Sequence, residues 1–238
     1  MLRFLPLLVN VFITVNSFGQ VIDEIRPDNV DMGEGSLVMN DGTELKGVIR
    51  YNDTEGGVVS FEGGSRSGSW TPRSVAGFEF FDEVKKRQRV FFTLDFDDDK
   101  TGKRPTFFEI IKDFKTFAVL AKMDPINIKK KNDVLFDGGK GHRSTKTVVQ
   151  QTETIYFMDA DGLVHPYMKV TRKMADHDFY DRTKFKNKLV DEDLIKKYLK
   201  EPGYSQTIKY ADDNELDLGV KDDFIKALDY YEQLIQKK

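Results

Sequence analysis

The sequence contains no cysteine, and only one of its 238 residues is a tryptophan and three are histidines. Without cysteine the chain forms no disulfide, so its stability must come from packing and backbone hydrogen bonds. None of the histidines occurs in a spacing such as H-E-x-x-H, which argues against a zinc enzyme. No catalytic or cofactor motif is recognisable elsewhere, so we expect no cofactor, with a calcium ion as the one alternative.

Neither sign of charge is in large excess, since 37 Lys and Arg oppose 40 Asp and Glu. A weakly acidic, well-mixed chain has no general attraction to nucleic acid, which would require a concentrated basic face. The 19 Phe and 9 Tyr are typical of an ordered globule. The length suits one large domain or two small ones.

A long apolar run occurs only at the N-terminus, over residues 4–15. Arg3 precedes this run, and the small residues needed by a signal peptidase occur in Ser17-Phe18-Gly19. We therefore expect residues 1–19 to be a signal peptide cleaved between Gly19 and Gln20. The run is shorter than the ~20 residues that cross a bilayer, so we expect a periplasmic or secreted protein without a membrane span.

Residues 20–82 predict an N-terminal β module. Strands over 36–39 and 43–51 flank Asn40-Asp41-Gly42, a turn sequence typical of tight hairpins. Three further short strands are expected over 58–61, 69–71 and 75–81. Short strands so closely spaced favour a small, strongly bent antiparallel sheet or an SH3-like barrel.

Residues 83–172 predict a second antiparallel β block. Its expected strands cover residues 88–96, 106–112, 116–123, 147–158 and 163–170. The last two flank Asp159-Ala160-Asp161-Gly162, a second hairpin turn. Residues 124–146 contain six basic and three acidic residues and few apolar ones, so we expect a mobile basic loop there. This loop could hold a phosphate or an acidic polymer, although it lacks the Walker spacing.

Residues 173–238 change to a helical period. Asp191 can cap a first helix that Pro202-Gly203 ends, and a short second helix follows. A third helix over 222–236 carries an apolar stripe that includes Phe224, Leu228 and Tyr231. The fold class predicted is therefore α+β, with an N-terminal small-barrel-like module, a second β block and C-terminal helices.

The acidic segment around residues 95–99 is the sharpest candidate for chemistry. Asp95, Asp97 and Asp99 have the alternate spacing of calcium ligands. Lys100 replaces the glycine of an EF-hand, and Thr106 replaces its closing glutamate. A solvated turn at a strand end is therefore the competing interpretation. A calcium-stabilised module, or an exported hydrolase that combines these aspartates with His177, is the alternative function.

Aromatic residues suggest a different kind of site. Trp70, Phe78, Phe80 and Phe81 could form a contact patch on the N-terminal module, although such aromatics also pack cores. Because no paired, tunable acid and base groups are recognisable, the sequence favours a non-catalytic envelope protein that binds another protein or a cell-surface polymer.

Three segments also carry a family resemblance: the leader ending at Gln20, residues 35–49 with the pattern D-G-x-x-x-x-G-x-I, and residues 72–78. Over residues 1–170 the chain resembles uncharacterised exported proteins of Bacteroidota. The resemblance implies a periplasmic or envelope location and a β-rich fold, and it implies no activity or site residues.

Overall fold

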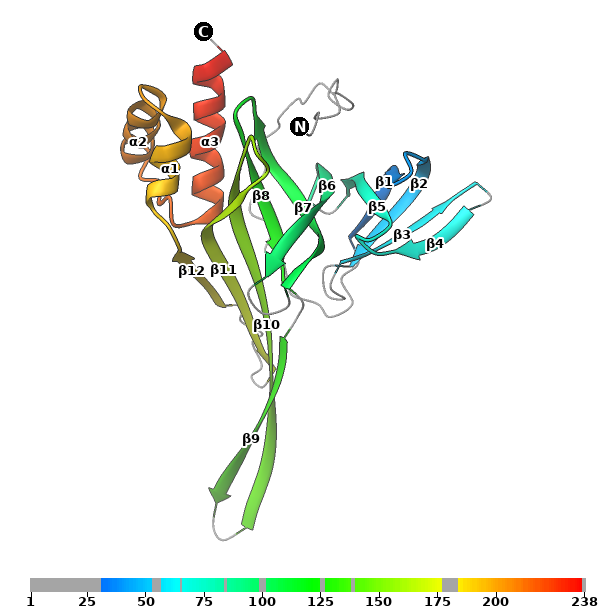
Figure 1. Cartoon of the computed structure of the whole chain (residues 1–238). Coiled ribbons are helices and arrows are strands. Elements are labelled where there is room, and N and C mark those ends of the chain that lie inside the picture. The colour runs from blue at the N-terminus through cyan, green and yellow to red at the C-terminus, as the bar shows by residue number, and fades with distance from the viewer. Residues whose placement is uncertain are drawn as a thin grey trace.

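The computed structural model describes residues 31–52, 57–64, 66–83, 85–98, 102–124, 127–137, 140–176 and 184–236. The expected signal peptide, Asp99 and His177 lie outside these ranges. The described residues form one twelve-stranded antiparallel sheet with three C-terminal helices (Figure 1). The predicted α+β class is consistent with this architecture.

The strands follow one another through the sheet in an order close to their order in the chain. Their bounds are β1 Asp31–Met39, β2 Glu44–Asn52, β3 Val58–Gly63, β4 Arg66–Trp70, β5 Val75–Asp82, β6 Arg87–Asp98, β7 Gly102–Phe114, β8 Phe117–Met123, β9 Asn127–Asp137, β10 Lys140–Asp159, β11 Val164–Asp176 and β12 Lys184–Leu189. Across the sheet the order is β12-β11-β10-β8-β7-β6-β5-β1-β2-β3-β4, and β9 pairs with β10 outside this path. Every pairing is antiparallel, as expected where short connections join neighbouring strands.

Both predicted hairpin turns are confirmed. At the β1–β2 turn, Gly42 has a φ of 85° and its N–H donates to the Met39 carbonyl. At the β10–β11 turn, Gly162 has a φ of 81° and donates to the Asp159 carbonyl. Glycine adopts this left-handed conformation without the steric cost that other residues meet, which is why the sequence identified both turns.

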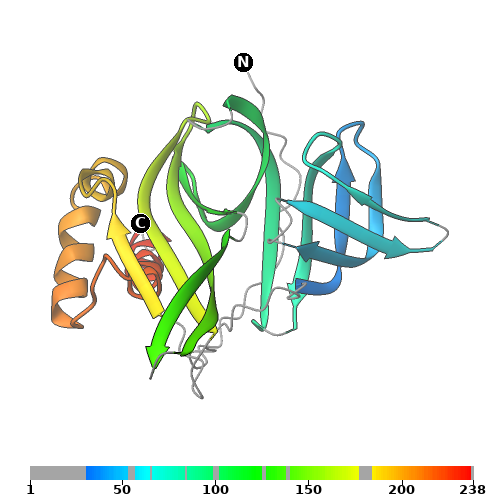
Figure 2. The ribbon, with the colours of Figure 1, turned by 90° about the horizontal axis from the view of Figure 1, so that it is seen from below.

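The N-terminal strands do not form a closed barrel. Strand β5 pairs with β1 on one side and with β6 on the other, so the sheet continues into the second β block. Residues 87–92 of β6 pair with β5, whereas residues 91–98 pair with β7. Figure 2 shows the resulting curved sheet, with the N-terminal strands at one end and the helices at the other. Two adjacent β blocks were expected, and the structure joins them through β6.

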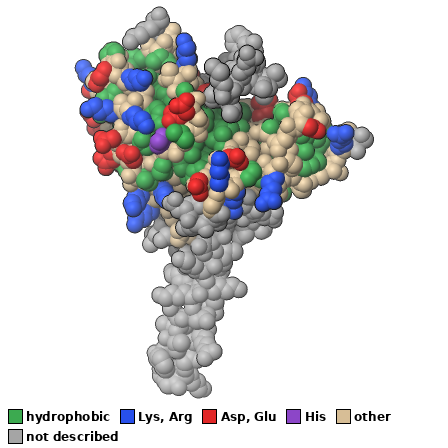
Figure 3. Space-filling view, viewed as in Figure 1, with side chains coloured by type: hydrophobic (Ala, Val, Ile, Leu, Met, Phe, Trp, Pro, Cys, Tyr) green, Lys and Arg blue, Asp and Glu red, His purple; other side chains and the backbone are tan. Residues whose placement is uncertain are grey.

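The three predicted helices are confirmed as α1 Asp193–Leu199, α2 Gly203–Asp213 and α3 Lys221–Gln236. Helices α1 and α3 cover one face of the sheet beside β8, β10 and β11, and their apolar stripes meet the inward residues of these strands. This helix-side core consists of Phe114, Phe117, Val119, Ala121, Ile155, Phe157, Tyr167, Met168, Val170, Leu194, Ile195, Tyr198, Leu199, Phe224, Leu228 and Tyr231. Helix α2 packs against α3, where the rings of Tyr210 and Tyr230 stack. In Figure 3, acidic and basic side chains are interspersed over this end of the molecule.

A second core lies under the N-terminal strands. It contains Leu37, Ile49, Tyr51, Val59, Phe61, Val75, Phe78, Phe80, Phe91 and Phe107. A third cluster, around Phe108, Leu120 and Tyr156, lies on the sheet face opposite the helices. The aromatic content that the sequence shows is thus divided among three clusters on the two faces of one sheet.

The predicted basic loop is instead a pair of strands. Residues 127–137 form β9, and they pair with residues 140–150 of β10. The loop prediction was wrong because this segment, with three consecutive lysines and few apolar residues, lacks the alternation of apolar and polar residues by which a strand is usually recognised. A strand of a two-stranded hairpin needs no buried face, so the usual alternation is not required of it.

Candidate functional site: a concave surface beside Trp70 and a buried charge network

A hollow with a volume of about 450 Å³ opens between the β1–β2 turn and the edge strand β4, and we call its wall the concave surface. Its lining combines one large aromatic ring with charged, hydroxyl and aliphatic side chains, contributed by Met39, Asp41, Thr43, Leu45, Arg66, Ser67 and Trp70. A binding surface in which a few polar groups flank an aromatic ring can fix the orientation of a polar ligand.

Trp70 is held in place by its neighbours on one face of the sheet. Its ring centroid lies 6.5 Å from that of Phe61, which belongs to the N-terminal core. The indole extends back over Gly68, two residues earlier on the same strand, where a Cβ atom would lie only 2.9 Å from indole Cη2. The absence of a side chain at residue 68 therefore makes room for the ring.

The polar groups of the surface carry opposite charges. The Asp41 carboxylate accepts a hydrogen bond of 2.8 Å from the Thr43 N–H, and this bond lowers the pKa of Asp41. The nearby Arg66 guanidinium acts in the same direction. Asp41 is thus a carboxylate at neutral pH, suited to accept hydrogen bonds and unsuited to donate a proton as a general acid.

A side chain added at residue 68, beneath the indole, should test the position of Trp70 in the concave surface. We expect Gly68→Ala to displace the Trp70 ring and shift its fluorescence emission, with little loss of stability because the end of one side chain can move. Ser69→Ala, a change on the opposite face of β4, is the matched control. Unchanged emission in Gly68→Ala would contradict the ring position, and the single tryptophan makes the signal unambiguous.

The structure separates the four aromatic residues proposed as a contact patch. Phe78 and Phe80 are 3% and 0% exposed and belong to the N-terminal core, so neither is available to a partner. Phe81 is 38% exposed, because successive residues of β5 point to opposite faces. Of the four, Trp70 alone lines the concave surface.

Most of the acidic segment around residues 95–99 forms the end of strand β6. Asp95 and Asp97 are exposed on β6, where they pair across the ladder with Pro105 and Lys103. Asp99 lies outside the described residues, so the three-aspartate calcium site stays a prediction. Within the described ranges, no group of three or more His, Asp or Glu side chains is placed to hold a metal ion.

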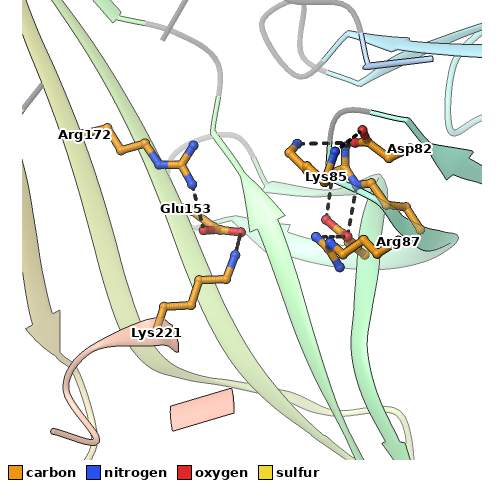
Figure 4. A network of polar contacts seen from close by, with 8 residues as sticks. Asp82, Lys85, Arg87, Glu153, Arg172 and Lys221 are labelled. Carbon is orange, nitrogen blue, oxygen red and sulfur yellow. Dashed lines mark hydrogen bonds and ion pairs between the residues drawn. The ribbon is translucent and has the colours of Figure 1, made fainter. Parts of the chain in front are cut away.

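The strongest concentration of buried charge lies elsewhere, on β5, β6 and β7 (Figure 4). Arg89 is 2% exposed and donates two hydrogen bonds to Glu109, from Nε at 3.0 Å and from Nη2 at 2.8 Å. A second arginine, Arg87, lies 2.7 Å from the same carboxylate. Arg89 also lies 3.6 Å from Asp82, which is 1% exposed, and Lys85 lies 3.7 Å from this aspartate.

A second group of charges adjoins the first. Glu153 of β10 is 4% exposed, lies 2.6 Å from Lys221 at the start of α3 and 3.9 Å from Arg172 of β11. Lys221 also lowers the pKa of Glu109, so the two groups are electrostatically linked. We call these eight residues the charge network: Asp82, Lys85, Arg87, Arg89, Glu109, Glu153, Arg172 and Lys221.

The charge network lies at the boundary between two cores. On one side Glu109 of β7 pairs with Phe91 of β6, which belongs to the N-terminal core. On the other side it pairs with Ala121 of β8, which belongs to the helix-side core. Directly paired residues share a sheet face, so the charges lie between the two apolar clusters. Arg89 also lies over the rings of Phe91 and Phe80, at 4.8 and 5.7 Å from their centroids.

The electrostatics of the network favour a structural role. Burial alone would raise the pKa of Glu109 and of Glu153, but the cations beside them lower both pKa values below their usual range. Carboxylates held in the charged form do not serve as general acids near neutral pH. The charge network was not predicted from the sequence. The available signal was the alternation of Arg87, Arg89 and Phe91, which places two arginines on the same face of β6 as a core residue.

Comparisons with known proteins do not identify the chain: it matches no protein-family model, no curated protein and no solved structure. Among the described residues, no helix has the length and apolar character needed to cross a bilayer.

Proposed function

We propose that this protein is a non-catalytic, exported envelope protein that binds a cell-surface saccharide polymer through the concave surface beside Trp70. The observation that carries this proposal is the composition of that surface, in which one indole ring is flanked by a carboxylate, a guanidinium and two hydroxyl groups. The apolar face of a sugar ring packs on an indole, and the sugar hydroxyls hydrogen-bond to neighbouring polar groups.

Two further features support the proposal. The surface is open and lies at the edge of the sheet, where a long polymer can pass without threading into the fold. The pKa values of Asp41 in the concave surface and of Glu109 and Glu153 in the charge network are lowered, which suits binding and ion pairing better than acid catalysis. Export is supported by the leader-like segment over residues 1–19.

Cosedimentation with purified peptidoglycan sacculi tests the binding, using protein that begins at Gln20. We expect the protein to sediment with sacculi, and Trp70→Ala to weaken this binding at least about tenfold, because a central aromatic often dominates an interface. Phe81→Ala is the matched control, since it removes an exposed aromatic that does not line the surface.

Three results would contradict the proposal. Equal sedimentation of Trp70→Ala and wild type would remove the concave surface from the binding role. Failure of the wild type to bind sacculi, together with protein crosslinks at residues 41, 66 or 67, would favour a protein partner. Recovery of native protein with an intact Met1 from the cytosol would overturn export.

A further inference from the structure

Strand β9 and the first part of β10 form a two-stranded arm that leaves the sheet (Figure 1). Among the strands of the described part of the chain, residues 127–137 pair with β10 alone. Strand β10 acquires its partner β11 only from Thr147 and its partner β8 only from Glu153. Residues 131–137 of β9 lie beyond the part of β10 that also pairs with β11, and at ~3.3 Å per residue these seven residues extend about 23 Å from the sheet.

The arm concentrates positive charge in an otherwise acidic chain. Residues 127–150 contain six Lys or Arg and two Asp, a net charge of +4 in a chain of net charge −3, so all other residues together carry −7. The pairing of β9 with β10 brings the cations of both strands into one narrow element. This is the concentrated basic element that composition alone did not reveal.

The arm is electrostatically costly as an isolated element. Its register places Lys131 directly opposite Lys146, and like charges in such pairs are destabilising, whereas Asp137 and Lys140 form a single opposite-charge pair at the far end. A two-stranded hairpin without further packing is also only marginally stable in water. An anionic partner would neutralise the repulsion and stabilise the arm.

The sequence at the far end of the arm indicates the kind of anionic partner. Val134, Leu135 and Phe136 are consecutive apolar residues, and they lie at the end of β9 that is most distant from the sheet (Figure 1). Asp137 and Lys140 pair at the extreme end of the arm, Arg143 lies opposite Val134, and the other four basic residues lie closer to the sheet than this apolar segment. A bilayer surface offers anionic headgroups together with an apolar phase, whereas an acidic polymer offers only the charge.

From this juxtaposition we propose that the arm docks on an anionic phospholipid bilayer. Residues 134–136 enter the interface and the lysines of residues 129–131 attract the headgroups. This contact is peripheral and does not require a membrane span. It is also independent of the concave surface beside Trp70, so either site can fail without affecting the other.

Vesicle cosedimentation of the chain from Gln20 onward tests the proposal. We expect binding to phosphatidylcholine vesicles that contain one third phosphatidylglycerol, weaker binding at high salt, and little binding to phosphatidylcholine alone. The triple change Lys129→Gln, Lys130→Gln and Lys131→Gln should weaken binding about a hundredfold. The matched control changes Lys186, Lys188 and Lys196 to Gln, which removes the same charge from exposed positions and should leave binding nearly unchanged.

The double change Leu135→Ser and Phe136→Ser separates a bilayer from other polyanions. We expect it to weaken vesicle binding at least about tenfold, because burial of large apolar side chains is lost while the charge stays the same. Unfolding curves that match wild type would show that each variant is folded.

Four outcomes would overturn the proposal. The first is no binding of wild type to anionic vesicles, and the second is full binding of the variant in which Lys129, Lys130 and Lys131 are changed to Gln. The third is an equal loss in the control variant with three other lysines changed, and the fourth is full binding of the variant with Leu135→Ser and Phe136→Ser. The last result, together with capture of the protein on immobilised heparin, would assign the arm to an acidic polymer.

Discussion

Replacing Arg89 with methionine is expected to lower the free energy of unfolding by about 3–5 kcal/mol, because the change breaks a buried network of ion pairs. Arg89 contacts two carboxylates that are nearly inaccessible to water, Glu109 and Asp82. Its loss leaves both acids with fewer cations in a site of low polarity. Urea denaturation monitored through Trp70 fluorescence measures the effect.

A double variant and an exposed pair serve as controls. Arg89→Met combined with Glu109→Leu also removes the buried carboxylate that has lost one of its two arginine partners, so the double variant should be more stable than Arg89→Met alone. Arg50→Met breaks the exposed Arg50–Glu62 pair of 3.2 Å and should cost less than about 1 kcal/mol. A double variant whose loss equals the sum of the two single losses would contradict the coupling between Arg89 and Glu109.

The same network sets an acid limit on stability. The pKa values of Glu109 and Glu153 are lowered in the folded chain, so their stabilising contribution is fully present above the unfolded-state value of about 4.3. It is lost as pH falls below that value, because the unfolded chain then binds protons more readily than the folded one. Stability measured below about pH 4.3 should therefore fall less steeply in the Arg89→Met, Glu109→Leu variant than in wild type.

The second large effect is expected at Phe78. Phe78→Ala should cost about 3–5 kcal/mol, since it removes a ring from the centre of the N-terminal core. Its ring centroid lies 4.5 Å from that of Phe91, 5.0 Å from that of Phe107 and 5.1 Å from that of Tyr51. Chemical denaturation compares this variant with wild type.

Phe81→Ala is the internal control, because it removes the same side chain from the opposite face of the same strand. The exposure of Phe81 predicts a cost below about 1 kcal/mol. Similar losses in the two variants would contradict the orientation of β5. A loss of partner binding in Phe78→Ala would reflect unfolding and not a contact surface.

Elements whose conformation depends on neighbouring residues could be predicted from the sequence. Asp41-Gly42 and Asp161-Gly162 identified two hairpin turns, since glycine allows the left-handed backbone that each turn requires. The stripe containing Phe224 and Leu228 identified α3, because residues three or four apart share one face of a helix. The α+β class follows from these local signals.

The way in which these elements combine depends on contacts between residues that are distant in the sequence. The pairing of β5 with β6 left the sheet open and joined the two β blocks, and no local signal distinguishes this pairing from closure of a barrel. Arg89 meets Glu109 across β6 and β7, and the lysine-rich residues 127–137 become a strand by pairing with β10. Turns and helices are fixed by short-range sterics and periodicity, whereas strand pairing depends on partners and register that distant residues supply.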